Sequence, residues 1–192
     1  TLQSGNYRLT EWQAAILLGG LKRLDAQVKY RDANAQYLNA QLAEIPGILP
    51  MRRRKEVTQQ SYFNFTFRLD VKELKVTNAQ FNAALNAELN AGDAFEPPYD
   101  PLNQCGLYKP RTKVRHKLGA DYWKAVNPAR FKLPVCEDAT KRSGVAVHHV
   151  ALMNERDDMD QIAAAVRKLV DNIGEVRQLK AGEGKKYQAL SR

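Results

Sequence analysis

The chain has 192 residues, of which 44% are apolar and 27% are charged, a balance typical of a globular protein and unlike that of a disordered one. The net charge of +9 permits an anionic partner without selecting one, and two cysteines, Cys105 and Cys136, are too few for a disulfide framework. No apolar run reaches the ~20 residues that a membrane span needs, so we expect a cytoplasmic protein that does not enter a membrane.

The first predicted element is a long helix. Thr10, followed three residues later by Gln13, fits a capping box, and Pro46-Gly47 ends the helical pattern after Glu44. A helix of this length, ~50 Å, exceeds what the chain needs to cover its own core. It therefore either breaks near Gly19-Gly20 or packs one end against something outside this chain. Its apolar or small stripe consists of Leu21, Leu24, Val28, Ala35, Leu38, Leu42 and Ile45.

Two strands are predicted next, a short one over residues 48–54 and a better one over residues 61–69. Apolar and polar residues alternate in the second, which predicts one buried and one solvated face. The predicted buried positions are Phe63, Phe65, Phe67 and Leu69. A helix from Thr77 to about Ala91 follows, and the proline-containing residues 93–118 are too long for a simple connection, so we expect a functional loop or covering arm.

The remaining pattern is a short helix near residues 119–126, a strand over 145–150 and an amphipathic helix over 157–173. This order of elements predicts an α+β fold, with a small antiparallel sheet and helices packed on one face. We expect residues 1–45 to form a turn and a long helix, and residues 46–173 to form a small domain with its arm. Residues 174–192 are expected to be a polar, mobile tail.

No motif for a self-sufficient catalytic site is present, since the sequence lacks GxGxxG, Walker, HExxH and GxSxG patterns. His148-His149 is the best metal candidate. Adjacent residues on a strand point to opposite faces, which argues against chelation of one ion. We prefer the interpretation that one histidine faces a cleft while the other is packed or solvated.

Two basic stretches, residues 51–55 and 109–117, allow a different function. In the second, Lys and Arg occupy alternate positions, so an extended segment would present five charges on one side to a phosphate backbone. Tyr108 is the only aromatic residue close by, which leaves no stacking platform. The open alternatives are a solvated arm, pairing with acidic groups of a partner subunit, and a non-catalytic module that binds nucleic acid or an acidic protein.

The turn before the first helix is a further candidate. Gly5-Asn6 offers backbone N–H groups and a side-chain amide at a helix start, and together with Arg8 these groups form a reasonable phosphate cradle. Helix capping is the usual role of such turns, so the turn alone does not identify a site.

Read together, these segments resemble the DegT/StrS-type sugar aminotransferases. Residues 4–15, SGNYRLTEWQAA, are similar to the family's G-x-N-[YFH]-[RK]-[ML]-[ST]-E-x-Q-A-A segment. Within the family, the residues EWQAA favour the cyclitol (inosose) branch. Two departures are Gly20, where the family usually has Gln, and Cys136, where it has Ala. Further resembling segments follow in the family's order: IPGI at 45–48, the aromatic strand at 62–68, YDPLN at 99–103, LPVCE at 133–137 and VHHVAL at 147–152.

The resemblance implies a fold type I enzyme that depends on pyridoxal 5′-phosphate (PLP). Such an enzyme would aminate a keto-sugar or keto-cyclitol, with glutamate or glutamine as the amino donor. None of the motifs of the family's large domain, which carries the lysine that forms the Schiff base, occurs here. The resemblance therefore implies that this chain is the C-terminal part, inactive in isolation: a long helix bridging to the absent large domain, plus the small domain.

Site residues follow from the same resemblance. The enzymes are homodimers with sites at the subunit interface, so Asn6 would reach the cofactor phosphate of the neighbouring subunit. Arg8 and Tyr99 would line the substrate side. His148 or His149 would do so as well, and the alignment leaves open which of them matches the family's histidine. No metal ion and no nucleic acid are expected.

Overall fold

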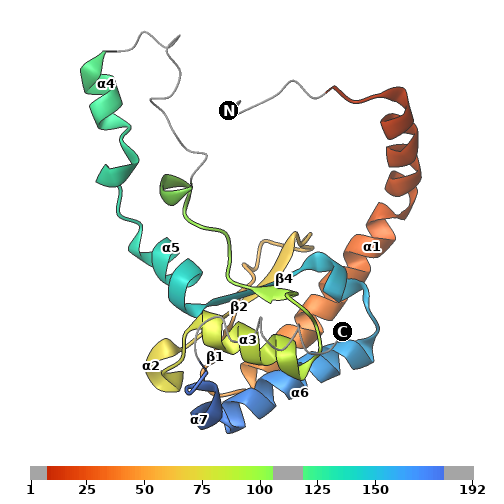
Figure 1. Ribbon diagram of the computed structural model, residues 1–192. Coiled ribbons are helices and arrows are strands. Elements are labelled where there is room, and N and C mark those ends of the chain that lie inside the picture. Colours follow the sequence, from red (N-terminus) through yellow and green to blue (C-terminus); the bar gives the residue numbers. More distant parts are fainter. Residues whose placement is uncertain (1–7, 106–118, 180–192) are drawn as a thin grey trace.

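A four-stranded antiparallel sheet forms the centre of the fold in the computed structural model, which describes residues 8–105 and 119–179 (Figure 1). The strand order is β1-β2-β4-β3, with antiparallel pairing throughout. The α+β class predicted from the sequence is thereby confirmed. The strands are β1 (Ile48–Pro50), β2 (Asn64–Leu69), β3 (Phe95–Glu96) and β4 (Gly144–His148).

The α-helices of the described part include the three long ones that the sequence predicts. The short helix predicted near residues 119–126 is present as well, and three further short helices were not predicted. 3-10 turns cover Leu102–Gln104, Pro128–Arg130 and His149–Met153. The helices are α1 (Glu11–Ala43), α2 (Val71–Leu74), α3 (Asn78–Glu88), α4 (Ala120–Ala125), α5 (Pro134–Asp138), α6 (Arg156–Asp171) and α7 (Ile173–Val176). None of these helices is both long enough and apolar enough to cross a membrane.

One face of the sheet carries the core. Phe65 and Phe67 on β2 lie opposite Val147 and Val145 on β4, and all four side chains are buried. Helices α1, α3 and α6 cover this face, as Figure 1 shows, which is the one-sided arrangement expected from the sequence. Their core residues include Leu38, Leu42, Phe81, Leu85, Met159 and Val166.

Helix α1 is anchored through its second half. The buried Asn34 side chain donates hydrogen bonds to the carbonyl oxygens of Leu152 and Asn154, at 3.0 and 2.9 Å. Tyr37 and Gln41 both donate to the Asp160 carboxylate on α6, at 2.7 and 2.8 Å. The helix runs through Gly19-Gly20 without interruption, so the break considered from the sequence does not occur.

The first half of α1 projects away from the sheet. Its apolar side chains are exposed, including Leu21 and Leu24 of the predicted stripe. Figure 1 shows this half and α4 extending on opposite sides of the molecule, beyond the sheet face that the helices leave open. The exposed apolar residues are Trp12, Ile16, Leu17, Leu18, Leu21 and Leu24.

The packed part extends further towards the C-terminus than predicted. Helix α7 follows α6, and its Val176 is buried, so residues 174–179 are not a free tail. The Gln80 amide donates to the carbonyl oxygens of Arg177 and Leu179, at 3.1 and 2.9 Å. These long-range bonds to α3 hold a segment whose polar composition alone indicates a mobile tail.

Candidate functional site

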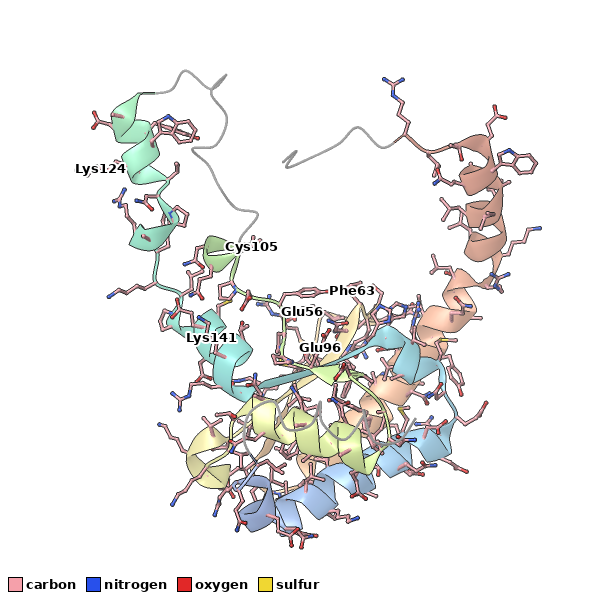
Figure 2. The ribbon with its side chains drawn as sticks, in the orientation of Figure 1. Glu56, Phe63, Glu96, Cys105, Lys124 and Lys141 are labelled. Carbon is pink, nitrogen blue, oxygen red and sulfur yellow. The ribbon has the colours of Figure 1, made fainter. Side chains whose placement is uncertain are left out.

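Four ring side chains meet at the end of the sheet. The Phe63 ring centroid lies 5.3 Å from that of His148, 6.3 Å from that of Tyr99 and 6.5 Å from that of His149. The two imidazole centroids are 4.0 Å apart. We call Phe63, Tyr99, His148 and His149 the aromatic cluster. Figure 2 shows the labelled Phe63 near the open face of the sheet, between α1 and the segment that carries α4 and α5.

Sheet pairing explains why these residues meet. Strands β2 and β4 are antiparallel and Asn64 pairs with His148, so the start of β2 lies beside the end of β4. Phe63 directly precedes the first strand and His149 directly follows the second. The backbone N–H of His149 donates to the carbonyl oxygen of Phe63 at 3.0 Å, which extends the ladder by one bond.

The same carbonyl oxygen orients the His149 ring. Its Nδ1 lies 3.1 Å from the Phe63 oxygen. A carbonyl oxygen can only accept, so this hydrogen bond requires a proton on Nδ1. In the neutral imidazole the other nitrogen, Nε2, is then an acceptor, which suits contact with a hydroxyl group of a ligand.

The histidine pair differs from the sequence-based expectation. Strand β4 ends at His148, and His149 begins a 3-10 turn, so the two rings do not point to opposite faces of a strand. His148 is exposed and His149 half-buried. Within the described part of the chain, no group of three or more His, Cys, Asp or Glu residues could hold a metal ion.

Tyr99 reaches the cluster from the segment after β3. Its carbonyl oxygen accepts a hydrogen bond from the Thr140 hydroxyl at 3.3 Å. A Cβ placed on Gly144 would lie 2.3 Å from the Ala139 carbonyl oxygen and 2.7 Å from Pro98 Cγ. Glycine at position 144 therefore allows this segment to lie directly against the π-helical turn Ala139–Ser143, and that contact positions Tyr99.

Phe63 is the member of the cluster that sequence reasoning missed. Alternation predicts that it shares the buried face with Phe65, but β2 begins only at Asn64, and the Phe63 side chain is 60% exposed. Phe63 thus lies one residue before the strand, although its carbonyl oxygen still accepts from the His149 N–H. The sequence signal that could have identified Phe63 is its position near the end of the predicted strand. At a strand end the alternating pattern no longer determines to which face a side chain points.

Arg8 and Asn6 stand apart from this cluster. Arg8 is exposed and precedes α1, at the end of the helix that projects away from the sheet. The structure therefore does not bring Arg8 to Tyr99 and the two histidines. Asn6 lies outside the described residues, so its predicted contact with a cofactor phosphate stays a prediction.

One of the two basic stretches is partly accounted for by the fold. Arg53, in the middle of residues 51–55, donates to the Asp32 carboxylate at 2.8 Å, and this largely buried pair ties the loop after β1 to α1. Burial, with a further contribution from the Asp32 carboxylate, raises the pKa of the neighbouring Tyr62 phenol, while Arg53 lowers it. The other stretch, 109–117, lies outside the described residues, so its nucleic-acid hypothesis stays a prediction.

Comparison with known proteins adds the following. Residues 3–167 match the model of the DegT/DnrJ/EryC1/StrS aminotransferase family. A relative described as L-glutamine:2-deoxy-scyllo-inosose aminotransferase, from Streptoalloteichus tenebrarius, is 39% identical over 177 residues, which cover 92% of this chain and 41% of the relative. An L-glutamine:scyllo-inosose aminotransferase from Streptomyces griseus is 35% identical over 176 residues, covering 91% of this chain and 41% of that protein.

The fold has a counterpart among solved structures. 3-Amino-5-hydroxybenzoic acid synthase superposes with a TM-score of 0.65 at 22% sequence identity, over 87% of this chain and 40% of that one. At this level of identity the likeness concerns the fold. The chain thus spans about two fifths of the length of both the sequence relatives and the structural neighbour.

Proposed function

The chain belongs to the DegT/DnrJ/EryC1/StrS aminotransferase family, and from that premise we propose that it is the C-terminal part of an enzyme that aminates a keto-cyclitol. The names of its relatives support inososes as the substrate class and glutamine as the amino donor. The family resemblance alone also allows a keto-sugar as the substrate and glutamate as the amino donor. On this proposal, α1 bridges to a large domain and the sheet belongs to the small domain.

The cofactor expected from the sequence is that of the family. Enzymes of this family depend on PLP, which supplies the electron sink for moving an amino group between donor and ketone. The aromatic cluster offers imidazole, phenol and phenyl groups but no primary amine that could attach PLP covalently. Its chemistry therefore fits the substrate side of such a site. On this proposal, the attachment lysine belongs to the large domain.

The observation that carries the proposal is the convergence of Tyr99, His148 and His149. Three residues assigned to the substrate side by resemblance lie in segments 49 positions apart in sequence, yet their rings surround the Phe63 ring. A phenol hydroxyl both donates and accepts, and a neutral imidazole does so through its two nitrogens. These groups can orient a polyhydroxylated ring through several hydrogen bonds without requiring that it carry a charge.

The remaining contacts concern a second subunit. We propose a cytoplasmic homodimer in which Asn6 donates to the cofactor phosphate in the neighbouring subunit and Arg8 contributes to the substrate side. The distance between the start of α1 and the aromatic cluster supports this division, since Arg8 would then serve a site other than the one formed by its own small domain. The exposed apolar residues of α1 support burial against further protein.

The test compares the intact enzyme with the 192-residue chain. Each is incubated with PLP, L-glutamine and either scyllo-inosose or 2-deoxy-scyllo-inosose, and the amine product is measured by mass spectrometry. We expect product only from the intact enzyme. Borohydride reduction at equimolar PLP should attach the cofactor to one lysine of the intact enzyme and to no single lysine of the 192-residue chain.

Two results would contradict the proposal. One is the absence of amine product from PLP-loaded intact enzyme with every keto-cyclitol and keto-sugar supplied. The other is stoichiometric PLP attachment within the 192-residue chain, because that would place the reactive lysine here.

A further inference from the structure

Phe63 is a large apolar side chain that lies mostly in water. Its side chain is 60% exposed, whereas Phe65, two residues later on the same strand path, is 2% exposed. Leaving an aromatic side chain largely in water forgoes much of the burial free energy that Phe65 gains. The ring nevertheless stands at the centre of the aromatic cluster, with one neighbour presented edge-on, since the Phe63 and His148 planes meet at 86°.

The three rings that lie nearest Phe63 among the aromatic contacts all belong to side chains that carry polar atoms. Tyr99, His148 and His149 lie around Phe63, so an apolar surface is framed by a phenol hydroxyl and imidazole nitrogens. Small-molecule sites are typically built in this way, with an apolar wall for shape and a few placed polar groups for orientation.

A cyclitol ring has the matching chemistry. When its hydroxyl groups are equatorial they point outward around the rim, and the two faces of the ring consist of C–H bonds. One such face can pack on a phenyl ring, while the rim hydroxyls meet hydrogen-bonding groups beside it. A linear amino donor such as glutamine has no comparable face.

We propose that Phe63 is a specificity-determining residue, the apolar wall against which the C–H face of the keto-cyclitol packs; this inference rests on the proposed function. Phe63 also acts through its backbone, because its carbonyl oxygen fixes the Nδ1–H tautomer of His149 and thereby makes Nε2 an acceptor for a substrate hydroxyl. The Phe63 ring forms the apolar wall, and the Phe63 carbonyl oxygen orients the His149 imidazole.

Replacing Phe63 by leucine separates these two contributions. The backbone carbonyl and its bonds to His149 remain, and only the flat aromatic face is lost. In the intact enzyme, the Phe63→Leu variant should raise KM for the keto-cyclitol about tenfold, the effect of losing one aromatic contact. The half-reaction with glutamine, measured without ketone, should stay within about twofold of its original rate, because the donor does not use the wall.

Phe131→Leu is the matched control. Phe131 is also an exposed phenylalanine, but it lies after the 3-10 turn Pro128–Arg130, outside the aromatic cluster. We expect this variant to keep the KM for the ketone. Equal increases in both variants would overturn the proposal, because the effect would not belong to the cluster.

The outcomes separate this inference from the function on which it rests. If the unmodified enzyme aminates no ketone, the proposed function fails. If it aminates a keto-cyclitol and Phe63→Leu changes that KM less than twofold, only the role of Phe63 fails. A variant that loses its thermal unfolding transition would also overturn the proposal, because it would show that Phe63 belongs to the core.

Discussion

Phe63, just before β2, and Phe65, on β2, make different energetic contributions. Phe65 is enclosed by the core, while Phe63 lies on the rim among polar side chains. We expect Phe65→Ala to lower the free energy of unfolding by about 3–5 kcal/mol, since it removes buried contacts and leaves a cavity. Phe63→Ala should cost less than about 1 kcal/mol, because most of its surface is already in water. Urea denaturation of the two variants of the 192-residue chain measures the difference.

Equal losses in the two variants would show that Phe63 is as enclosed as Phe65. The sequence pattern alone leads to that wrong conclusion, because both residues occupy the same phase of the alternation. Phe63 lies just before β2 begins, and the partner of its carbonyl oxygen is His149, 86 positions away. A local pattern cannot contain this information.

Helix α1 consists of an anchored half and an exposed half. Asn34 satisfies two carbonyl oxygens at once, and it belongs to the half that packs on α6 and the 3-10 turn His149–Met153. Asn34→Ala should therefore lower the free energy of unfolding by about 2–3 kcal/mol, because both acceptors lose a partner and one of the two bonds is fully buried. Thermal or urea unfolding followed by circular dichroism measures this loss.

Asp25→Ala in the same helix is the control for Asn34→Ala. Asp25 is exposed in the projecting half, and alanine has the higher helix propensity, so its effect should lie within about 0.5 kcal/mol of zero. A loss as large as that of Asn34→Ala would mean that the projecting half is packed within this chain.

The two helices that begin at predicted threonine caps were found where expected, and a segment held by contacts distant in sequence was not predicted. The capping box expected at Thr10 is formed and begins α1, and Thr77, the expected start of the second helix, caps α3 and also forms a capping box. Helix α5 and the π-helical turn after it were not predicted. Arg68 on β2 holds them by donating to Asp138 and Ser143, and the Asn78 side chain donates to the Thr140 carbonyl. None of these partners is near in sequence.

At the scale of the whole molecule, the sequence selected candidate site residues but did not place them relative to one another. Family motifs selected Tyr99, His148 and His149, and the sheet brings these three together. The same motifs selected Arg8, which stands at the far end of α1. A sequence motif does not tell whether a residue contributes to the site of its own subunit or to that of a neighbouring subunit. Only the spatial arrangement distinguishes Arg8 from Tyr99, His148 and His149 in this respect.

The projecting half of α1 is the largest departure from a self-contained fold. Apolar side chains occur on all sides of residues 12–24, a composition typical of a helix surrounded by other protein. Adding a Cβ to Gly19 or Gly20 would meet no atom within 4 Å. Each glycine in a helix interior lowers helix stability by ~1 kcal/mol relative to alanine. Because glycine has no side chain, such a position allows a neighbouring backbone to approach closely, and that contact can offset the loss.

Trp12 reports on whether this half is covered. Its side chain is 84% exposed, and a Trp123→Phe variant leaves it as the only tryptophan of the chain. In the dilute 192-residue variant, Trp12 should emit as in water and be quenched freely by acrylamide. In the intact enzyme, the part of the emission that a Trp12→Phe change removes should lie at shorter wavelength and be quenched several-fold less, because the proposed large domain surrounds the helix. A shielded Trp12 in the dilute 192-residue variant would mean that the chain covers this helix itself, and the case for α1 as a bridge would be lost.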